Sequence, residues 1–268
     1  IVGMIRSGKE EFRDMSVTEQ EAYIQELASV NTDWIDLLFR TAVSTNHYLS
    51  FSGGSEKNTY YVSFGYSKDN GAVKKTDYDR YNLSGKIDAN PNKHLHFQLG
   101  FDMAMQNSTG PSTDPFSYAY FANPYERPFN EDGSYRADYT YYKLPKVNGS
   151  YDPTIPPNGF NMLREMNETE SKTDNFSITS RFNLDYSFFK QLKFSGLASY
   201  SFTNNKSDNY KGKDTYAAFV DRLYFDTWGN SSRTYSSISQ SNTNNSSYSL
   251  RGQLSYSDVY REIHRFSV

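Results

Sequence analysis

The chain has 268 residues and a formal net charge of −3, so it offers no basic surface for nucleic acid. Its mean hydropathy is −0.79, and no apolar run approaches the roughly eighteen residues of a membrane helix, which excludes a helical membrane protein. Aromatic residues make up 17% of the chain, which suits the aromatic girdles of a transmembrane β-barrel, and the absence of cysteine fits an envelope protein that avoids accidental disulfides.

Residues 1–46 carry a helix signal and no strand alternation. Ser16-Val17-Thr18-Glu19 is a capping-box pattern, and Tyr23, Leu27 and Val30 follow at helical spacing. The spacing predicts a helix near 18–30, with its apolar positions packed on the rim of a sheet. Because the next strand must run toward a short glycine turn, we expect this segment to be an extracellular loop element.

Residues 47–268 alternate apolar and polar side chains in successive segments, the pattern of strands with two different faces. In the clearest segment, 95–105, Leu, Phe and Met occupy every second position, while His96, Gln98 and Asp102 fall between them. Period-2 counting gives about eight strands. The alternating segments cover 49–51, 60–66, 81–87, 95–105, 176–186, 192–202, 248–256 and a last one from about 263.

The length of the clearest segments favours a transmembrane β-barrel, whose strands need about nine to eleven residues to cross the hydrocarbon. Short connections alternate with longer ones throughout, as in a barrel with tight periplasmic turns and long extracellular loops. We therefore expect an all-β, antiparallel transmembrane barrel segment. The short connections are 53–57, 90–93, 187–191 and 258–262, and the longer ones are 69–77, about 107–173 and about 204–240.

Two early runs carry a family resemblance. Asn-Thr-Asp-Trp-Ile-Asp-Leu-Leu-Phe-Arg-Thr at 31–41, followed by 46–57, resembles the early barrel of the SusC/RagA-like TonB-dependent transporters of Bacteroidetes. Runs 60–66, 71–77 and 123–133 continue it in the same order. The family's signal peptide, N-terminal extension, TonB box and plug do not appear here. We therefore expect a fragment, with residues 47–268 supplying about eight strands of a 22-stranded barrel.

The resemblance implies a function in the outer membrane of a Gram-negative bacterium. Members are TonB-dependent importers that take up oligosaccharides, or peptides in some cases, together with a SusD-like surface lipoprotein. Energy would come from TonB-ExbB-ExbD through the missing plug and TonB box, and the remaining partners would be outer-membrane lipid and the glycan or peptide substrate. No cofactor is implied. A surface glycan-binding or adhesin-like β-protein without transport stays open as the alternative.

The chain is not expected to be an enzyme, because it has no phosphate loop, zinc-protease helix or serine elbow. A glycan-cleaving sandwich would need two carboxylates facing one another on adjoining strands, and no convincing pair is found. His94 and His96 share a strand face, but no third metal ligand lies nearby in sequence, so lumen-facing polar roles are favoured. Asp33 and Asp36 are interpreted as solvated or structural.

The long loops are the expected place for a binding surface. Segment 116–127 sets aromatic side chains beside polar ones, a composition that stacks on sugar rings or anchors a partner protein. The same aromatics would equally serve to fold the loop onto itself, and both interpretations stay open. The candidate ligand- or partner-binding residues are Tyr118, Tyr120, Tyr125, Arg127, Tyr224 and Trp228.

Overall fold

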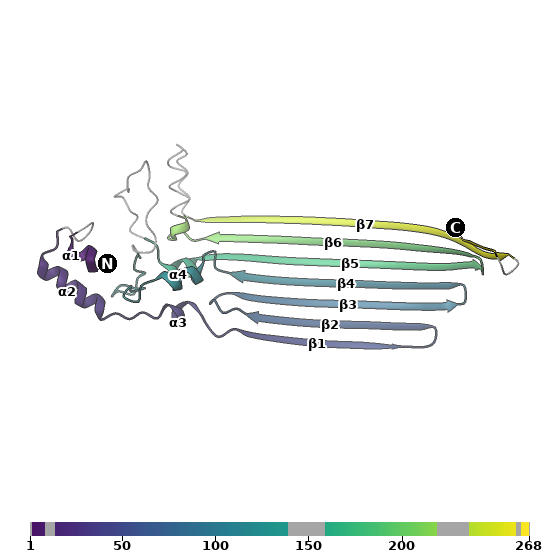
Figure 1. Ribbon diagram of the computed structural model, residues 1–268, viewed down its shortest axis with the longest axis horizontal. Helices are drawn as coiled ribbons and strands as arrows, with labels where there is room; N and C mark the ends of the chain where they lie inside the picture. The colour runs from purple at the N-terminus through teal and green to yellow at the C-terminus, as the bar shows by residue number, and fades with distance from the viewer. Residues whose placement is uncertain (1, 9–13, 139–158, 219–235, 261–263, 268) are drawn as a thin grey trace, which may run out of the picture.

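The computed structural model describes residues 2–8, 14–138, 159–218, 236–260 and 264–267 (Figure 1). Eight strands form one antiparallel sheet in the order β1 to β8, so each strand pairs with its sequence neighbours. The predicted antiparallel sheet is thereby confirmed. It is open, because β1 and β8 do not pair with each other. The strands are β1 (Val43–Gly54), β2 (Asn58–Asn70), β3 (Asp77–Asn92), β4 (Leu95–Gly110), β5 (Thr169–Phe189), β6 (Leu192–Lys211), β7 (Ser237–Tyr260) and β8 (His264–Ser267).

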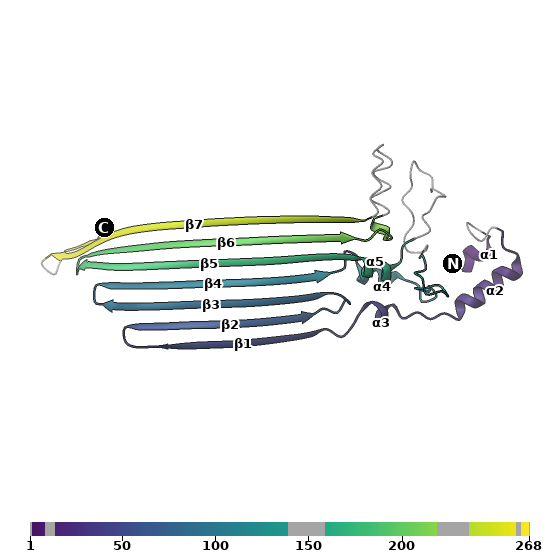
Figure 2. The ribbon, with the colours of Figure 1, turned by 180° about the vertical axis from the view of Figure 1, so that it is seen from behind.

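The helices gather at one end of the sheet, opposite the short turns (Figures 1 and 2). They are α1 (Val2–Arg6), α2 (Val17–Ala28), α3 (Trp34–Leu38), α4 (Pro115–Phe121) and α5 (Met162–Glu168). Among the described residues, no helix combines the length and the hydropathy that spanning a membrane requires.

Helix α2 lies where the capping box predicts it. The Ser16 hydroxyl accepts from the Glu19 N–H at 3.3 Å, and the Glu19 carboxylate accepts from the Ser16 N–H at 2.7 Å. The apolar side chains Tyr23, Ile24 and Leu27 of α2 are half-buried, and their packing on the barrel rim stays a prediction. None of its residues is fully buried, and it lies beyond the end of the sheet beside α1 (Figure 1), because its few apolar positions make only a weak stripe.

The register divides the sheet into two faces, since directly opposite residues share a face. The apolar face includes the cross-strand row Phe64, Leu83, Met103, Ile178 and Phe202. The polar face includes the row Tyr61, Lys86, Gly100, Arg181 and Ser199. The apolar positions of β4 extend from 95 to 105 and those of β5 from 176 to 186, which defines an apolar band across the sheet.

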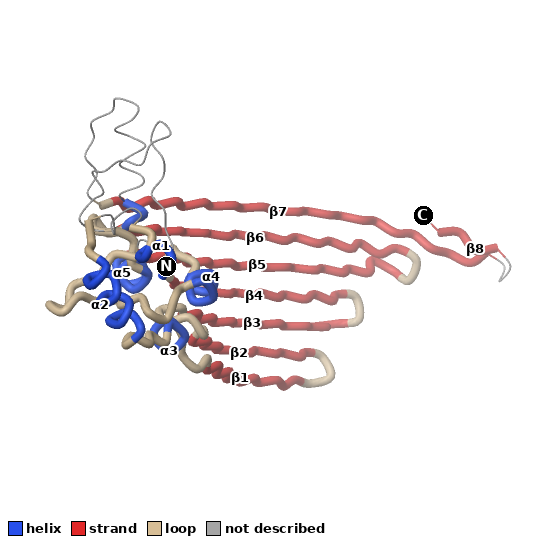
Figure 3. Tube along the Cα trace, turned by 60° about the vertical axis from the view of Figure 1, so that its left-hand side comes forward, coloured by secondary structure: helices blue, strands red, loops and turns tan. Residues whose placement is uncertain are grey.

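Strands β5, β6 and β7 run for 21, 20 and 24 residues, about twice what a membrane crossing needs (Figure 3). Toward the helical end, beyond Phe176, Phe202 and Tyr248, both faces are polar except at the cross-strand pair Tyr210 and Ile238. The strands therefore continue past the predicted loop boundaries at 173, 204 and 240. We call residues 171–179 of β5, 201–209 of β6 and 239–247 of β7 the outer halves, and these ranges include the last apolar-band residues Phe176, Ile178 and Phe202.

The short turns are staggered, and each reaches further than the one before (Figure 1). The pairing register measures the offset, because a strand continues past the residue opposite the preceding turn. Asn58 pairs with Ala89 while β3 continues to Asn92, Leu95 pairs with Tyr186 while β5 continues to Phe189, and Leu192 pairs with Tyr256 while β7 continues to Tyr260.

Candidate functional site

Side chains from several loops form a hydrophobic cluster at the helical end, which we call the rim core. Its buried members are Trp34, Leu38, Val73, Tyr118, Phe160, Met162 and Met166, and Tyr216 packs against them. They come from α3, the β2–β3 loop, the β4–β5 loop with α4 and α5, and the β6–β7 loop. Burial of this apolar surface is what holds the loops together.

Helix α3 inserts Trp34 into the rim core. The side chain of Asp33 caps the helix by accepting from the Asp36 N–H at 2.9 Å, so its predicted structural role is confirmed. The Trp34 ring meets Tyr118 edge-on, with centroids 5.0 Å apart, and its indole N–H donates to the Asn123 carbonyl at 3.0 Å. The N-terminal segment is thus fixed to the β4–β5 loop.

Tyr118, a candidate binding residue, is fully buried. Its hydroxyl donates to the Asp138 carboxylate at 2.7 Å, and its ring lies 5.6 Å from that of Phe160. A ring enclosed in this way has no face left for a ligand. We therefore correct its assignment from ligand contact to packing of the rim core.

Helix α4 turns its other face to solvent. Asp114 caps the helix by accepting from the N–H groups of Phe116 and Ser117, and these hydrogen bonds, foremost that of the Ser117 hydroxyl, lower the pKa of Asp114. Phe116, Tyr120 and Phe121 are 61%, 83% and 66% exposed, and we call them the aromatic patch. Tyr120 and Phe121 make a T-shaped pair with centroids 4.9 Å apart.

Tyr125 and Arg127 lie in the segment after α4, and both are half-buried. The Arg127 guanidinium approaches the Glu26 carboxylate of α2 at 3.4 Å. Burial raises the pKa of Tyr125, because its ionised form would lose solvation. The candidates Tyr224 and Trp228 lie outside the described residues.

Glu165 is a residue that sequence reasoning missed. It is 1% exposed, and its two carboxylate oxygens accept from the N–H groups of Tyr216 at 2.6 Å and Ala217 at 3.3 Å. Burial raises the pKa of Glu165. This junction joins the β4–β5 loop to the β6–β7 loop.

Asn161 caps α5, and it also escaped sequence reasoning. Its side-chain oxygen accepts from the Arg164 N–H at 2.9 Å, and its amide donates to the carbonyls of Pro128 and Arg136. An asparagine before an apolar run with a glutamate in the first turn is a helix-start signal. That signal was present in the sequence.

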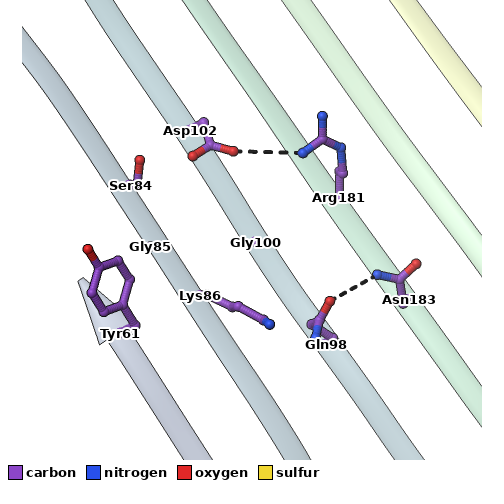
Figure 4. A pocket seen from close by; sticks show the side chains of 9 residues that line it. All are labelled: Tyr61, Ser84, Gly85, Lys86, Gln98, Gly100, Asp102, Arg181 and Asn183. Atoms are coloured by element: carbon purple, nitrogen blue, oxygen red, sulfur yellow. Dashed lines mark hydrogen bonds and ion pairs between the residues drawn. The ribbon is translucent and has the colours of Figure 1, made fainter. Parts of the chain in front are cut away.

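A hollow of about 320 Å³ lies on the polar face, over β3, β4 and β5 (Figure 4). Its floor is the bare backbone at Gly100, and polar side chains surround it. Arg181 and Asp102 approach to 3.8 Å, and the Asn183 amide donates to the Gln98 side chain at 3.4 Å. Both charged groups are largely exposed, so this hollow resembles a solvated wall more than a binding pocket.

His96 lies on the same face, nearer the short turns. Its ring nitrogens approach the carboxylates of Asp88 at 3.2 Å and Asp185 at 3.4 Å, while His94 meets the Ser187 carbonyl at 2.9 Å. Among the described residues, no group of three or more His, Cys, Asp or Glu side chains is arranged to hold a metal ion. By the two distances to Asp88 and Asp185, His96 bridges the carboxylates of the two strands on either side of β4.

Comparison with curated proteins finds TonB-dependent receptors, although no family model matches the chain. SusC of Bacteroides thetaiotaomicron is 49% identical over 59 residues, which cover 22% of this chain and 6% of SusC. Two TonB-dependent receptors of Formosa agariphila are 28% and 25% identical over 75% and 87% of this chain. The matches span 20% and 23% of those two proteins, so this chain corresponds to less than a quarter of their length.

Solved structures share the fold. The RagAB peptide importer in its closed-closed state aligns with a TM-score of 0.63 and 18% identity, over 99% of this chain and 28% of that one. Its open-open state gives a TM-score of 0.65 and 16% identity, over 99% and 30%. The arrangement of strands and loops described above is thus that of part of a larger barrel.

Proposed function

Because this chain resembles the SusC/RagA-like TonB-dependent receptors in sequence and in fold, we propose that it forms part of an outer-membrane importer of a Gram-negative bacterium. The whole protein takes up oligosaccharides, or peptides, with a SusD-like lipoprotein, and TonB-ExbB-ExbD supplies the energy. Import belongs to the whole protein, since the chain spans less than a quarter of its curated relatives.

The observation that carries this proposal is the apolar band. It occupies one face of successive strands, and its length in β4 and β5 equals the nine to eleven residues or so of a transmembrane strand. Large side chains in it remain exposed, including Phe64, Leu99 and Leu250 at 45%, 43% and 77%. Contact with lipid stabilises such a surface, whereas water does not.

The unequal ends of the sheet set its orientation. The short turns lie on the periplasmic side, and the long loops with the rim core lie outside. The segment before β1, with α2, forms an extracellular loop element, and the chain from Val43 onward forms barrel wall with its loops.

The aromatic patch is the surface we assign to the partner lipoprotein or the substrate. Exposed aromatic rings on a short rigid helix are typical of binding hot spots, because they bury much area at little entropic cost. Tyr120 is its most exposed member. Tyr125 and Arg127 follow the patch in sequence, and we assign the exposed parts of both side chains to the same binding surface.

The test is uptake by the whole protein in its host. Cells that express it should accumulate a labelled oligosaccharide, and loss of TonB or of the proton-motive force should abolish accumulation. A tagged whole protein should also copurify with a surface lipoprotein. Surface binding that needs no energy and leads to no accumulation would instead favour the adhesin-like alternative.

A further inference from the structure

The outer halves of β5 and β6 keep their charged side chains on one face, and the outer half of β7 carries none. Lys172, Asp174, Lys206 and Asp208 all lie on the side that continues the apolar face. The polar-face side carries only Ser, Thr and Asn, and we call it the hydroxyl–amide wall. Its cross-strand rows are Thr179–Ser201–Ser247, Ser177–Thr203–Asn245, Asn175–Asn205–Thr243, Thr173–Ser207–Ser241 and Ser171–Asn209–Ser239.

Folding alone does not explain this segregation. Beyond the apolar band both faces of the sheet meet water, and a strand solvated on both faces tolerates charge on either. On the charged side, Lys172 and Lys206 pair with Asp174 and Asp208 at 3.4 Å and 2.8 Å. Closer to the short turns, the polar face does carry charge, as at Arg181 and Arg251. The wall is therefore an uncharged stretch of an otherwise charged face.

The wall has spare hydrogen-bonding capacity. Hydroxyl and amide groups each donate and accept, and a hydroxyl rotates to suit its partner. Within the wall, the described structure pairs Thr179 with Ser201 at 3.3 Å and Asn209 with Ser207 at 3.5 Å. The wall side chains are exposed on β7 and half-buried on β5, so most of them reach solvent, and exchanging water for another hydroxyl-bearing molecule costs little.

The chemistry of the wall suits sugars better than peptides or ions. The backbone groups of β5 and β6 are committed to ladders with both neighbouring strands, so these two strands of the wall present side chains only. A peptide main chain is typically recognised by an open strand edge. Ionic solutes are concentrated by charge of the opposite sign, which the wall lacks.

We propose that the hydroxyl–amide wall is the solute-contacting surface of the importer's outer lumen and that it selects uncharged oligosaccharides. The proposal rests on the proposed function and adds the charge class of the substrate. The hydroxyl groups of the oligosaccharide exchange hydrogen bonds with successive rows of the wall as the oligosaccharide moves down the lumen. No row binds tightly, because single neutral hydrogen bonds contribute little beyond those to water.

The experiment compares uptake of neutral and uronate-bearing oligosaccharides of equal length by the whole protein in its host. Thr203→Lys places a cation on the central strand of the wall, and Asn204→Lys places the same cation one residue away on the opposite face, across from Phe176. The amount of protein in the outer membrane is measured for each variant, and Thr203→Ser serves as the conservative control.

The unaltered protein should prefer the neutral oligosaccharide. Thr203→Lys should shift the uptake ratio toward the uronate by about two- to fivefold, the effect of one charge several ångströms away in wet surroundings. Asn204→Lys and Thr203→Ser should leave the ratio unchanged. Two outcomes would contradict the wall proposal and leave the proposed function intact. In one, the unaltered protein takes up neutral and uronate-bearing oligosaccharides equally. In the other, both lysine variants shift the uptake ratio by the same amount. If only peptides enter, the glycan function falls with the wall proposal.

Discussion

At the residue scale, burial decides what each aromatic of α4 does. Tyr118 and Tyr120 are two positions apart, yet one is fully buried and the other is 83% exposed. Composition placed both in a candidate surface, because a short helix does not reveal which side faces a core that distant segments build. The Asp114-Pro115 pair, an N-cap followed by proline in the first turn, is the sequence signal that α4 begins there.

Substitution separates these two roles. Tyr118→Ala should destabilise the rim core by roughly 3–5 kcal/mol, as large-to-small changes in cores do. Tyr120→Ala should leave stability unchanged and weaken binding of the proposed partner lipoprotein or substrate by roughly tenfold. Limited proteolysis of the loops and a binding isotherm on the whole protein provide the two readouts. Equal loss of stability in both variants would contradict the assignment.

Glu165 makes the loop junction sensitive to pH. Its folded-state pKa is raised above the ordinary 4.5, so the folded junction favours the protonated form. The stability it contributes is present below the unfolded pKa and is lost as the pH rises through the raised folded value. Protection of the Tyr216 and Ala217 amides, corrected for intrinsic exchange, should therefore fall as the pH rises above 4.5 and through the raised pKa of Glu165.

Glu165→Gln should flatten this dependence, because the titrating group is gone. Glu165→Ala should lower the protection of the same amides at every pH, because both N–H groups then lose their acceptor. Each unsatisfied N–H group costs about 1–3 kcal/mol. The exposed Glu170→Gln is the matched control and should behave as the unaltered protein. An unchanged slope in Glu165→Gln would place the pH sensitivity elsewhere.

At the element scale, alternation predicted the strands only where one face is apolar. β4 begins at Leu95 as the pattern indicates, but β1 begins at Val43 and β7 at Ser237, earlier than expected. In these extensions both faces carry Ser, Thr and Asn, so no period of two exists to be read. The rim core could not be predicted either, because its members come from four segments spread between Trp34 and Tyr216.

Where β6 enters its loop, Gly212 lies against the backbone of α5. Its N–H donates to the Glu168 carbonyl at 2.8 Å, and a Cβ at this position would lie 2.9 Å from the same oxygen. Gly212→Ala should therefore shift the loop and destabilise the junction by about 1–3 kcal/mol. Gly100→Ala, whose Cβ would approach nothing closer than 3.8 Å, should be tolerated. Thermal unfolding of the whole protein in detergent compares them.

At the scale of the whole molecule, the two faces and two ends of the sheet predict which positions a membrane-impermeant reagent can reach. The chain has no cysteine, so single cysteines in a cysteine-free whole protein report their own surroundings. Asn242→Cys, in an outer half, should react with a membrane-impermeant maleimide on intact cells. Leu99→Cys, in the apolar band, should not react. Ser55→Cys, in a short turn, should react only after the outer membrane is opened, and its reaction on intact cells would invert the proposed orientation.

The stagger of the short turns determines how steeply the strands are tilted in the membrane. Each turn reaches about three residues, or roughly 10 Å, past the last, over a lateral distance of two strands, also roughly 10 Å. Bringing all the turns to one membrane surface therefore inclines the strands by about 45°, the steep end of the tilt known for outer-membrane barrels. At that inclination the apolar stretch of β4 rises about 25 Å, the height of the hydrocarbon-facing zone. The register offsets of this open sheet therefore determine its contribution to the shear of the closed barrel.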